Sequence, residues 1–114
     1  MATEFLDGVR GQYENFPYPP RDSADERKRL VETQGGFLDV VNFYCYGGME
    51  NFANGFRVLV AGCGTGDAAV FLAEQLRETG GEVVALDFSE SSLAIARRRG
   101  EERASLPSFG RRRR

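Results

Sequence analysis

The sequence contains no histidine and no tryptophan, and Cys45 and Cys63 are its only cysteines. Histidine is the commonest general base and a frequent metal ligand. Its absence leaves carboxylates, tyrosines, backbone amides or a bound cofactor to carry any chemistry. Two cysteines without histidine make none of the usual zinc sites, so we expect no metal. The count allows a disulfide, but a cytoplasmic location would argue against one.

Long hydrophobic runs are also absent. No stretch approaches the roughly 18 apolar residues that span a membrane. Acids at Glu4 and Asp7 stand where a secretory signal would have basic residues and then an apolar core. We therefore expect a cytoplasmic protein without a membrane segment. The 114 residues suffice for one small domain, and a charged fraction of 28% is ordinary for a globular one.

Charge is distributed unevenly along the chain. Residues 97–114 hold eight arginines against two glutamates, a balance of +6, so the rest carries −8 within the net charge of −2. The acidic body makes nucleic acid an improbable partner there. The arginine-rich end has two interpretations, a phosphate-binding arm or an interrupted natural sequence, and we favour the second.

The first half of the chain gives weaker signals. Three of the four prolines fall in residues 11–22, which predicts an extended arm rather than a helix. Asp22 or Ser23 can cap a short helix over residues 24–33, which Gly35 and Gly36 would end. The apolar and aromatic residues 37–54 favour a short helix followed by a loop, although their periodicity does not exclude a strand.

The second half has a clear pattern. Short apolar, β-branched runs at residues 56–61 and 82–87 predict two strands buried on both faces. Helical spacing follows over residues 67–78 and 90–99, the latter capped by Ser89. This order predicts the opening of a parallel α/β sheet. The inward positions would be Ala69, Leu72, Ala73 and Leu76 in the first helix and Leu93, Ala94 and Ala96 in the second.

A glycine-rich turn, Gly62-Cys63-Gly64-Thr65-Gly66, joins the first strand to its helix. Glycines permit positive φ and let a ligand approach the backbone, and the helix start favours a polar or anionic group. Asp87 ends the second strand, 21 residues after Gly66. In doubly wound sheets such an acid accepts hydrogen bonds from ribose hydroxyls. The combination predicts a nucleoside cofactor site.

A dinucleotide is one candidate ligand. The Gly-x-Gly-x-x-Gly fingerprint does not fit from Gly62, because Asp67 stands at its last position. It fits from Gly64 only with Ala69 as the final residue, a permitted variant. Asp67 would then lie close to the pyrophosphate, which disfavours a nicotinamide-dependent oxidoreductase.

Residues 58–66 resemble the first motif of class I S-adenosylmethionine-dependent methyltransferases, and residues 86–96 resemble their second strand and following helix. The resemblance covers residues 56–99. It implies a partial Rossmann-like methyltransferase fold, consisting of the first two parallel strands and flanking helices of a larger sheet. It implies S-adenosyl-L-methionine as the cofactor and an unknown methyl-acceptor substrate, and it gives no catalytic residue.

In that family the glycine loop wraps the methionine portion of the cofactor, and the second-strand acid binds the ribose. Ala61 stands where many members have an acid. The arm around Tyr18 also resembles, more weakly, a segment that precedes the domain in some members. The cofactor contacts implied are Ala61, Gly62, Cys63, Gly64, Thr65, Gly66, Asp87 and Phe88.

Simpler interpretations remain for individual residues. The glycine turn could bind nothing, and Asp87 could merely cap a helix. Cys63 is expected to be a small filler rather than a nucleophile, because no histidine exists to activate it. Asp67 is expected to be a favourable charge at a helix start. The four tyrosines, Tyr13, Tyr18, Tyr44 and Tyr46, are expected to be packing residues.

These observations divide the chain into three parts: residues 1–55 as an N-terminal arm with helices, 56–99 as the cofactor-binding unit, and 100–114 as a disordered or aberrant tail without a strand. We expect a methyltransferase by family, although this chain alone would be incomplete, inactive and marginally folded. The alternatives are a non-catalytic fragment that binds a nucleoside weakly and an NAD(P)-dependent oxidoreductase fragment.

Overall fold

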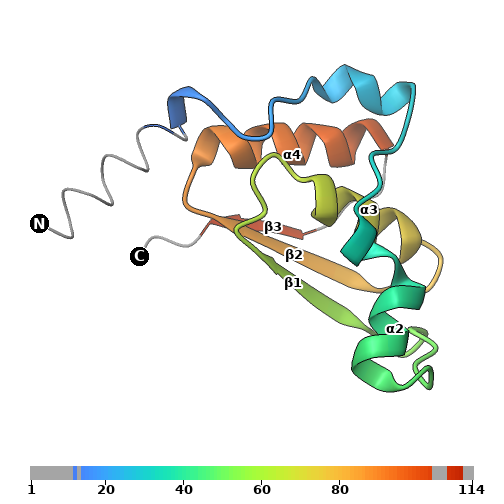
Figure 1. Cartoon of the computed structure of the whole chain (residues 1–114). Helices are drawn as coiled ribbons and strands as arrows, with labels where there is room; N and C mark the ends of the chain where they lie inside the picture. The colour runs from blue at the N-terminus through green and yellow to red at the C-terminus, as the bar shows by residue number, and fades with distance from the viewer. Residues whose placement is uncertain (1–11, 13, 104–107, 112–114) are drawn as a thin grey trace, which may run out of the picture.

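A computed structural model describes residues 12, 14–103 and 108–111 of the chain. Its centre is a three-stranded parallel sheet in the order β1-β2-β3, formed by Arg57–Ala61, Glu82–Asp87 and Ser108–Arg111 (Figure 1). The first two strands lie where the sequence predicts them. Because all three are parallel, their carboxyl ends share one edge, which is where ligands bind in open α/β sheets.

The helices α3 (Asp67–Gln75) and α4 (Glu90–Arg103) lie on the same side of this sheet (Figure 1). The predicted inward residues of α3 are all buried. In α4, Leu93 and Ala96 are buried, whereas Ala94 is half-buried. Beneath the helices, Val83 and Ala85 of β2 are 1% and 0% exposed. The core therefore lies between two helices and one face of the sheet.

The opposite face of the sheet is open within the described residues. Leu59 in the middle of β1 is 61% exposed, whereas its neighbours Val58 and Val60 pack towards the core. The expectation that β1 is buried on both faces is thus wrong here. Both crossover helices lie on one side, so alternate residues of β1 have no layer above them.

The third strand corrects the expectation that no strand follows Arg99. Residues 108–111 pair with β2 from Val84 to Asp87. The segment has little strand propensity of its own, so its conformation follows from pairing with the free edge of β2. Helix α4 also continues to Arg103, past the predicted end at Arg99. The rest of the predicted tail, residues 104–107 and 112–114, lies outside the described residues.

The N-terminal half is less regular than predicted. Residues 12, 14 and 15 are helical rather than extended, with the Phe16 amide donating to the Gln12 carbonyl at 2.8 Å. Residues 24–33 do not form a helix. They contain only the 3₁₀ turn η1 (Ser23–Arg27), because this polar stretch has no apolar stripe to dock. The Asp22 side chain caps η1, as the sequence allowed.

The predicted helix within residues 37–54 is confirmed as α2 (Leu38–Tyr46), which follows the short 3₁₀ turn η2 (Gln34–Gly36). The Gln75 side chain fastens this region to α3. Its Oε1 accepts from the Leu38 amide at 3.0 Å, and its Nε2 donates to the Gly36 carbonyl at 2.7 Å. The N-terminal segment therefore packs against the α/β unit as part of one structure.

Candidate functional site

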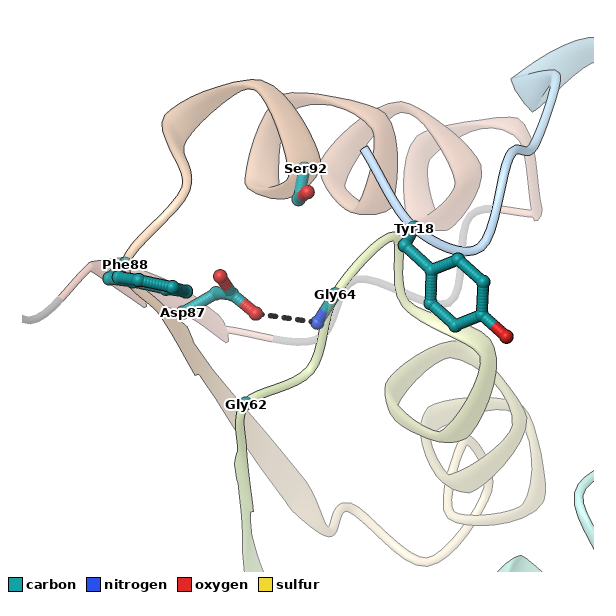
Figure 2. Close-up of a pocket in the computed structure, with 6 residues that line it drawn as sticks. All are labelled: Tyr18, Gly62, Gly64, Asp87, Phe88 and Ser92. Atoms are coloured by element: carbon teal, nitrogen blue, oxygen red, sulfur yellow. Dashed lines mark hydrogen bonds between the residues drawn. The ribbon is translucent and has the colours of Figure 1, made fainter. Parts of the chain in front are cut away.

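A pocket of about 380 Å³ lies at the carboxyl edge of the sheet, between the glycine loop (residues 62–66) and the end of β2. Figure 2 shows Asp87 beside Gly62 and Gly64, with Ser92 of α4 on the other side of the pocket. The pocket is lined by Tyr18, Gly62, Gly64, Asp87, Phe88 and Ser92.

The three glycines of the loop have different physical reasons to be glycine, although all have positive φ. A Cβ at Gly62 would meet no atom within 4 Å, so this position is open to the pocket. At Gly64 it would lie 2.5 Å from the Tyr18 carbonyl oxygen, and at Gly66 it would lie 2.8 Å from the Ala96 Cβ. Only Gly62 is thus left clear for a ligand that approaches the backbone.

Asp87 joins the loop to the start of α4. Its Oδ2 accepts from the Gly64 amide at 2.7 Å, and its Oδ1 accepts from the Ser89 amide at 3.0 Å. Ser89 in turn caps α4, because its Oγ accepts from the Ser92 amide at 3.1 Å, as predicted. Each carboxylate oxygen can accept more than one hydrogen bond, so Asp87 keeps acceptor capacity on the pocket side.

The amides of the glycine loop are used within the protein. Those of Cys63, Thr65 and Gly66 donate to the carbonyls of Leu86, Tyr18 and Cys63, at 2.9, 3.3 and 3.1 Å. The Gly64 amide is held by Asp87. The loop from Cys63 to Gly66 therefore offers no free backbone donor for a phosphate group.

Cys63, within the loop, is 8% exposed, and its thiol donates to the Gly64 carbonyl at 3.4 Å. Burial, with the nearby negative charge of Asp87, raises the pKa of this thiol to about 12. The neutral thiol is not a nucleophile at physiological pH, which agrees with the prediction that Cys63 is a filler. Both cysteines are free, so the possible disulfide does not form.

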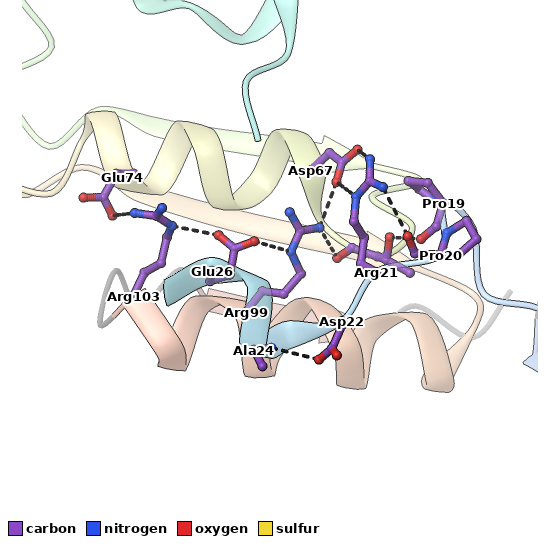
Figure 3. Close-up of polar contacts among 11 residues, drawn as sticks. Pro19, Pro20, Arg21, Asp22, Ala24, Glu26, Asp67, Glu74, Arg99 and Arg103 are labelled. Carbon is purple, nitrogen blue, oxygen red and sulfur yellow. Dashed lines mark hydrogen bonds and ion pairs between the residues drawn. The ribbon is translucent and has the colours of Figure 1, made fainter. Parts of the chain in front are cut away.

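Asp67 directly follows the loop, in the first turn of α3, and binds two arginines. Arg21 donates to both carboxylate oxygens at 2.8 Å, and Arg99 donates to Oδ1 at 2.8 Å (Figure 3). The hydrogen bond from Arg21, then that from Arg99, holds the pKa of Asp67 below its ordinary value. Asp67 therefore places a negative charge at the start of α3, as predicted, and also forms ion pairs with Arg21 and Arg99.

Arg99 is fully buried, with its side chain 0% exposed. Besides Asp67 it binds the carbonyl of Thr65 at 2.9 Å and the carboxylate of Glu26 at 3.0 Å. Arg103 also binds Glu26, at 2.7 Å (Figure 3). Within the arginine-rich end of residues 97–114, Arg99 is thus part of the interior and Arg103 is partly buried.

The structure brings together four of the eight predicted contacts: Gly62, Gly64, Asp87 and Phe88 line the pocket. The other four, Ala61, Cys63, Thr65 and Gly66, are not among its lining residues. Thr65 is 0% exposed and is bonded to the arm and to Arg99. Gly66 packs on Ala96.

Two lining residues were not predicted. Ser92 lies in the first turn of α4, a position that the cap at Ser89 could have indicated. Tyr18 comes from the arm, and its ring, 67% exposed, points away from Asp87 (Figure 2). Tyr44 is 78% exposed, so the packing interpretation is wrong for these two tyrosines. It holds for Tyr46, which contacts Phe52 and Phe56, whereas Tyr13 lies outside the described residues.

Comparison with known families gives the context for this geometry. Residues 58–109 match the model of a methyltransferase domain. The match covers slightly less than half of the chain. The matched residues include most of β1, the glycine loop, α3, β2 and α4. No curated protein matches the chain.

Solved structures share the fold at low sequence identity. Magnesium protoporphyrin IX methyltransferase from Synechocystis PCC 6803, solved with bound SAM, has a TM-score of 0.58 and 22% identity. The alignment covers 94% of this chain and 53% of that one. A second neighbour was solved in work on the conversion of a disulfide bond into a thioacetal group during echinomycin biosynthesis. It has a TM-score of 0.53 and 24% identity, and the alignment covers 98% of this chain and 40% of that one. The chain thus spans about half the length of these neighbours.

Among the residues that the structure describes, no group of three or more potential metal ligands comes together. Nor does any described helix have the length and apolar character needed to cross a membrane.

Proposed function

We propose that this chain is the cofactor-binding part of an S-adenosylmethionine-dependent methyltransferase. The observation that carries the proposal is the pocket between Gly62 and Asp87, which lies within the segment that matches a methyltransferase domain. The neighbour from Synechocystis PCC 6803 with the same fold was solved with bound SAM. S-adenosyl-L-methionine, held in this pocket, would be the methyl donor.

The pocket residues suit a nucleoside of this kind. Asp87 retains acceptor capacity after its two bonds to backbone amides, as needed for ribose hydroxyls. Gly62 leaves room for close approach of the ligand to the backbone. Phe88 adds an apolar side chain at the rim, 38% exposed. We propose these three residues as direct contacts.

The loop is poorly suited to the dinucleotide alternative. A pyrophosphate needs free amides in the loop, yet the amides from Cys63 to Gly66 are all bonded within the chain. Asp67 also carries a negative charge there, and its lowered pKa keeps it ionised. A cofactor without a phosphate group avoids both costs.

The bound cofactor would supply an activated methyl group on its sulfonium sulfur. The protein's contribution is then chiefly to hold the donor and the acceptor in line and to exclude water. The residues described here supply the donor side. We also propose a cytoplasmic location, because both cysteines are free, as a reducing compartment favours.

The test is a calorimetric titration of this chain with S-adenosylhomocysteine and, separately, with NAD. We expect saturable binding of S-adenosylhomocysteine and none of NAD at the same concentrations. Tight binding of NAD without S-adenosylhomocysteine binding would contradict the proposal and restore the oxidoreductase alternative.

A further inference from the structure

We propose, on the basis of the cofactor site above, that Arg21 and Asp67 are positioning residues for the cofactor. Their ion pair holds residues 18–21, called the strap here, across the glycine loop. The strap thereby completes the wall of the pocket at Tyr18 and fixes the loop in its binding conformation. The strap, including Arg21, lies outside the segment that matches the methyltransferase domain, because that segment begins at residue 58.

The strap touches the loop through its backbone. The Tyr18 carbonyl accepts from the Thr65 amide at 3.3 Å, and the Pro19 carbonyl accepts from the Thr65 hydroxyl at 2.5 Å. A Cβ at Gly64 would lie 2.5 Å from the same Tyr18 carbonyl oxygen. The loop at residues 64 and 65 is therefore shaped against the strap, in the same place where Gly64 lines the pocket.

The Arg21–Asp67 pair fastens the strap to the body of the protein. Both guanidinium contacts are 2.8 Å long, a two-pronged geometry that fixes direction as well as distance. The two side chains are 30% and 21% exposed, so the pair is partly shielded from water. Arg99 holds Asp67 from α4, which makes the anchor point rigid (Figure 3).

A second pair provides a matched control. Arg27 of η1 binds both carboxylate oxygens of Glu102 on α4, at 2.8 and 3.2 Å. This pair also ties the N-terminal segment to the α/β unit, but it touches neither the glycine loop nor the pocket lining. If Arg21 only stabilised the fold, replacing Arg21 or Arg27 by alanine would change the affinity for the cofactor to a similar extent.

The experiment compares Arg21→Ala, Arg21→Lys and Arg27→Ala in the 114-residue chain. The affinity for S-adenosylhomocysteine is measured by calorimetry, the exchange of the Thr65 amide by NMR, and stability by urea unfolding. We expect Arg21→Ala to bind about tenfold more weakly and to exchange the Thr65 amide faster. Arg21→Lys should recover part of the affinity, since it keeps the charge but not the two-pronged contact. Arg27→Ala should bind like the wild type.

Two results would overturn the proposal. One is wild-type affinity in Arg21→Ala, and the other is an unchanged exchange rate of the Thr65 amide in that variant. An equal loss of affinity in Arg27→Ala would also count against it, because it would reduce the effect to general stability. Failure of the wild-type chain to bind S-adenosylhomocysteine is a separate outcome, which would contradict the proposed function itself and this proposal with it.

Discussion

Two aspartates flank the glycine loop, and the protein uses them differently. Asp87 faces the pocket and accepts hydrogen bonds from the amides of Gly64 and Ser89. Asp67 is not among the pocket's lining residues and is held by the guanidinium groups of Arg21 and Arg99. The first carboxylate is bonded to neutral donors and keeps capacity for a ligand. The second is neutralised by cations.

The difference shows how partners decide the role of a carboxylate. A carboxylate paired with two arginines, one of them buried, is committed to the structure, because losing it would leave Arg21 unpaired and buried Arg99 with Glu26 alone. A charge that meets only backbone amides keeps its net negative charge, so it can attract polar groups of a ligand. We therefore expect changes near Asp67 to act first on stability, and changes at Asp87 to act first on binding.

The largest expected effect is on stability, in Arg99→Ala. This change removes the cation shared by Asp67 and Glu26 and leaves both carboxylates with fewer partners in the interior. Removing one member of a buried pair typically costs about 3–5 kcal/mol. Urea unfolding followed by circular dichroism would measure it. The control is Arg98→Ala on the same helix, where the side chain is exposed, and it should change the free energy of unfolding by less than about 0.5 kcal/mol. Equal effects in the two variants would remove the distinction between the aspartates.

Next in size is the effect of Asp87→Ala on binding. We expect the affinity for S-adenosylhomocysteine to fall by about 1.5–3 kcal/mol, the usual contribution of hydrogen bonds to a charged group. Calorimetry gives the affinity, and an NMR spectrum confirms that the variant is folded. Unchanged affinity in a folded variant would mean that Asp87 serves only to hold Gly64 and Ser89.

A smaller effect is expected in the pH dependence of stability. Arg21 and then Arg99 lower the pKa of Asp67 in the folded state, so the unfolded state binds a proton more readily. The stabilisation is therefore complete above the unfolded pKa of about 4 and is lost as the pH falls through the lower folded value. Urea midpoints of the wild type and Arg21→Ala, measured from pH 6 to pH 2, should converge as the pH falls. A constant difference would show that Arg21 does not act through Asp67.

Much of the fold was predictable because local pattern and tertiary structure agree. The strand over residues 82–87 and the Ser89 cap follow from the apolar run and from capping chemistry, whereas the periodicity of residues 37–54 left the helix α2 open to a strand alternative. The third strand was not predictable, because its pairing comes from the free edge of β2 rather than from its own residues. The open face of β1 depends on which side the helices lie, which the sequence pattern alone does not specify.

The site was predictable where it depends on the chain's local order, and not where distant segments meet. Gly62 and Asp87 follow from the strand–turn–helix pattern and the next strand end. The roles of Arg21 and Arg99 depend on contacts 46 and 32 residues away along the chain from Asp67. No local pattern distinguishes these arginines from their exposed neighbours Arg97 and Arg98.

The smallest expected effect concerns Cys63 of the glycine loop, which takes part in neither aspartate's role. Burial and the charge of Asp87 raise the pKa of its thiol to about 12, so at pH 8 the thiolate is almost absent. Cys45, which is exposed, should therefore be the one thiol that reacts promptly with a disulfide reagent. Spectrophotometric titration of the native chain should show one reactive thiol, and a second only after addition of urea.

Cys63→Ala should bind S-adenosylhomocysteine within about twofold of the wild type, because the thiol does not line the pocket. Rapid labelling of Cys63, or loss of binding in Cys63→Ala, would show that the loop opens or that the thiol takes part in the site.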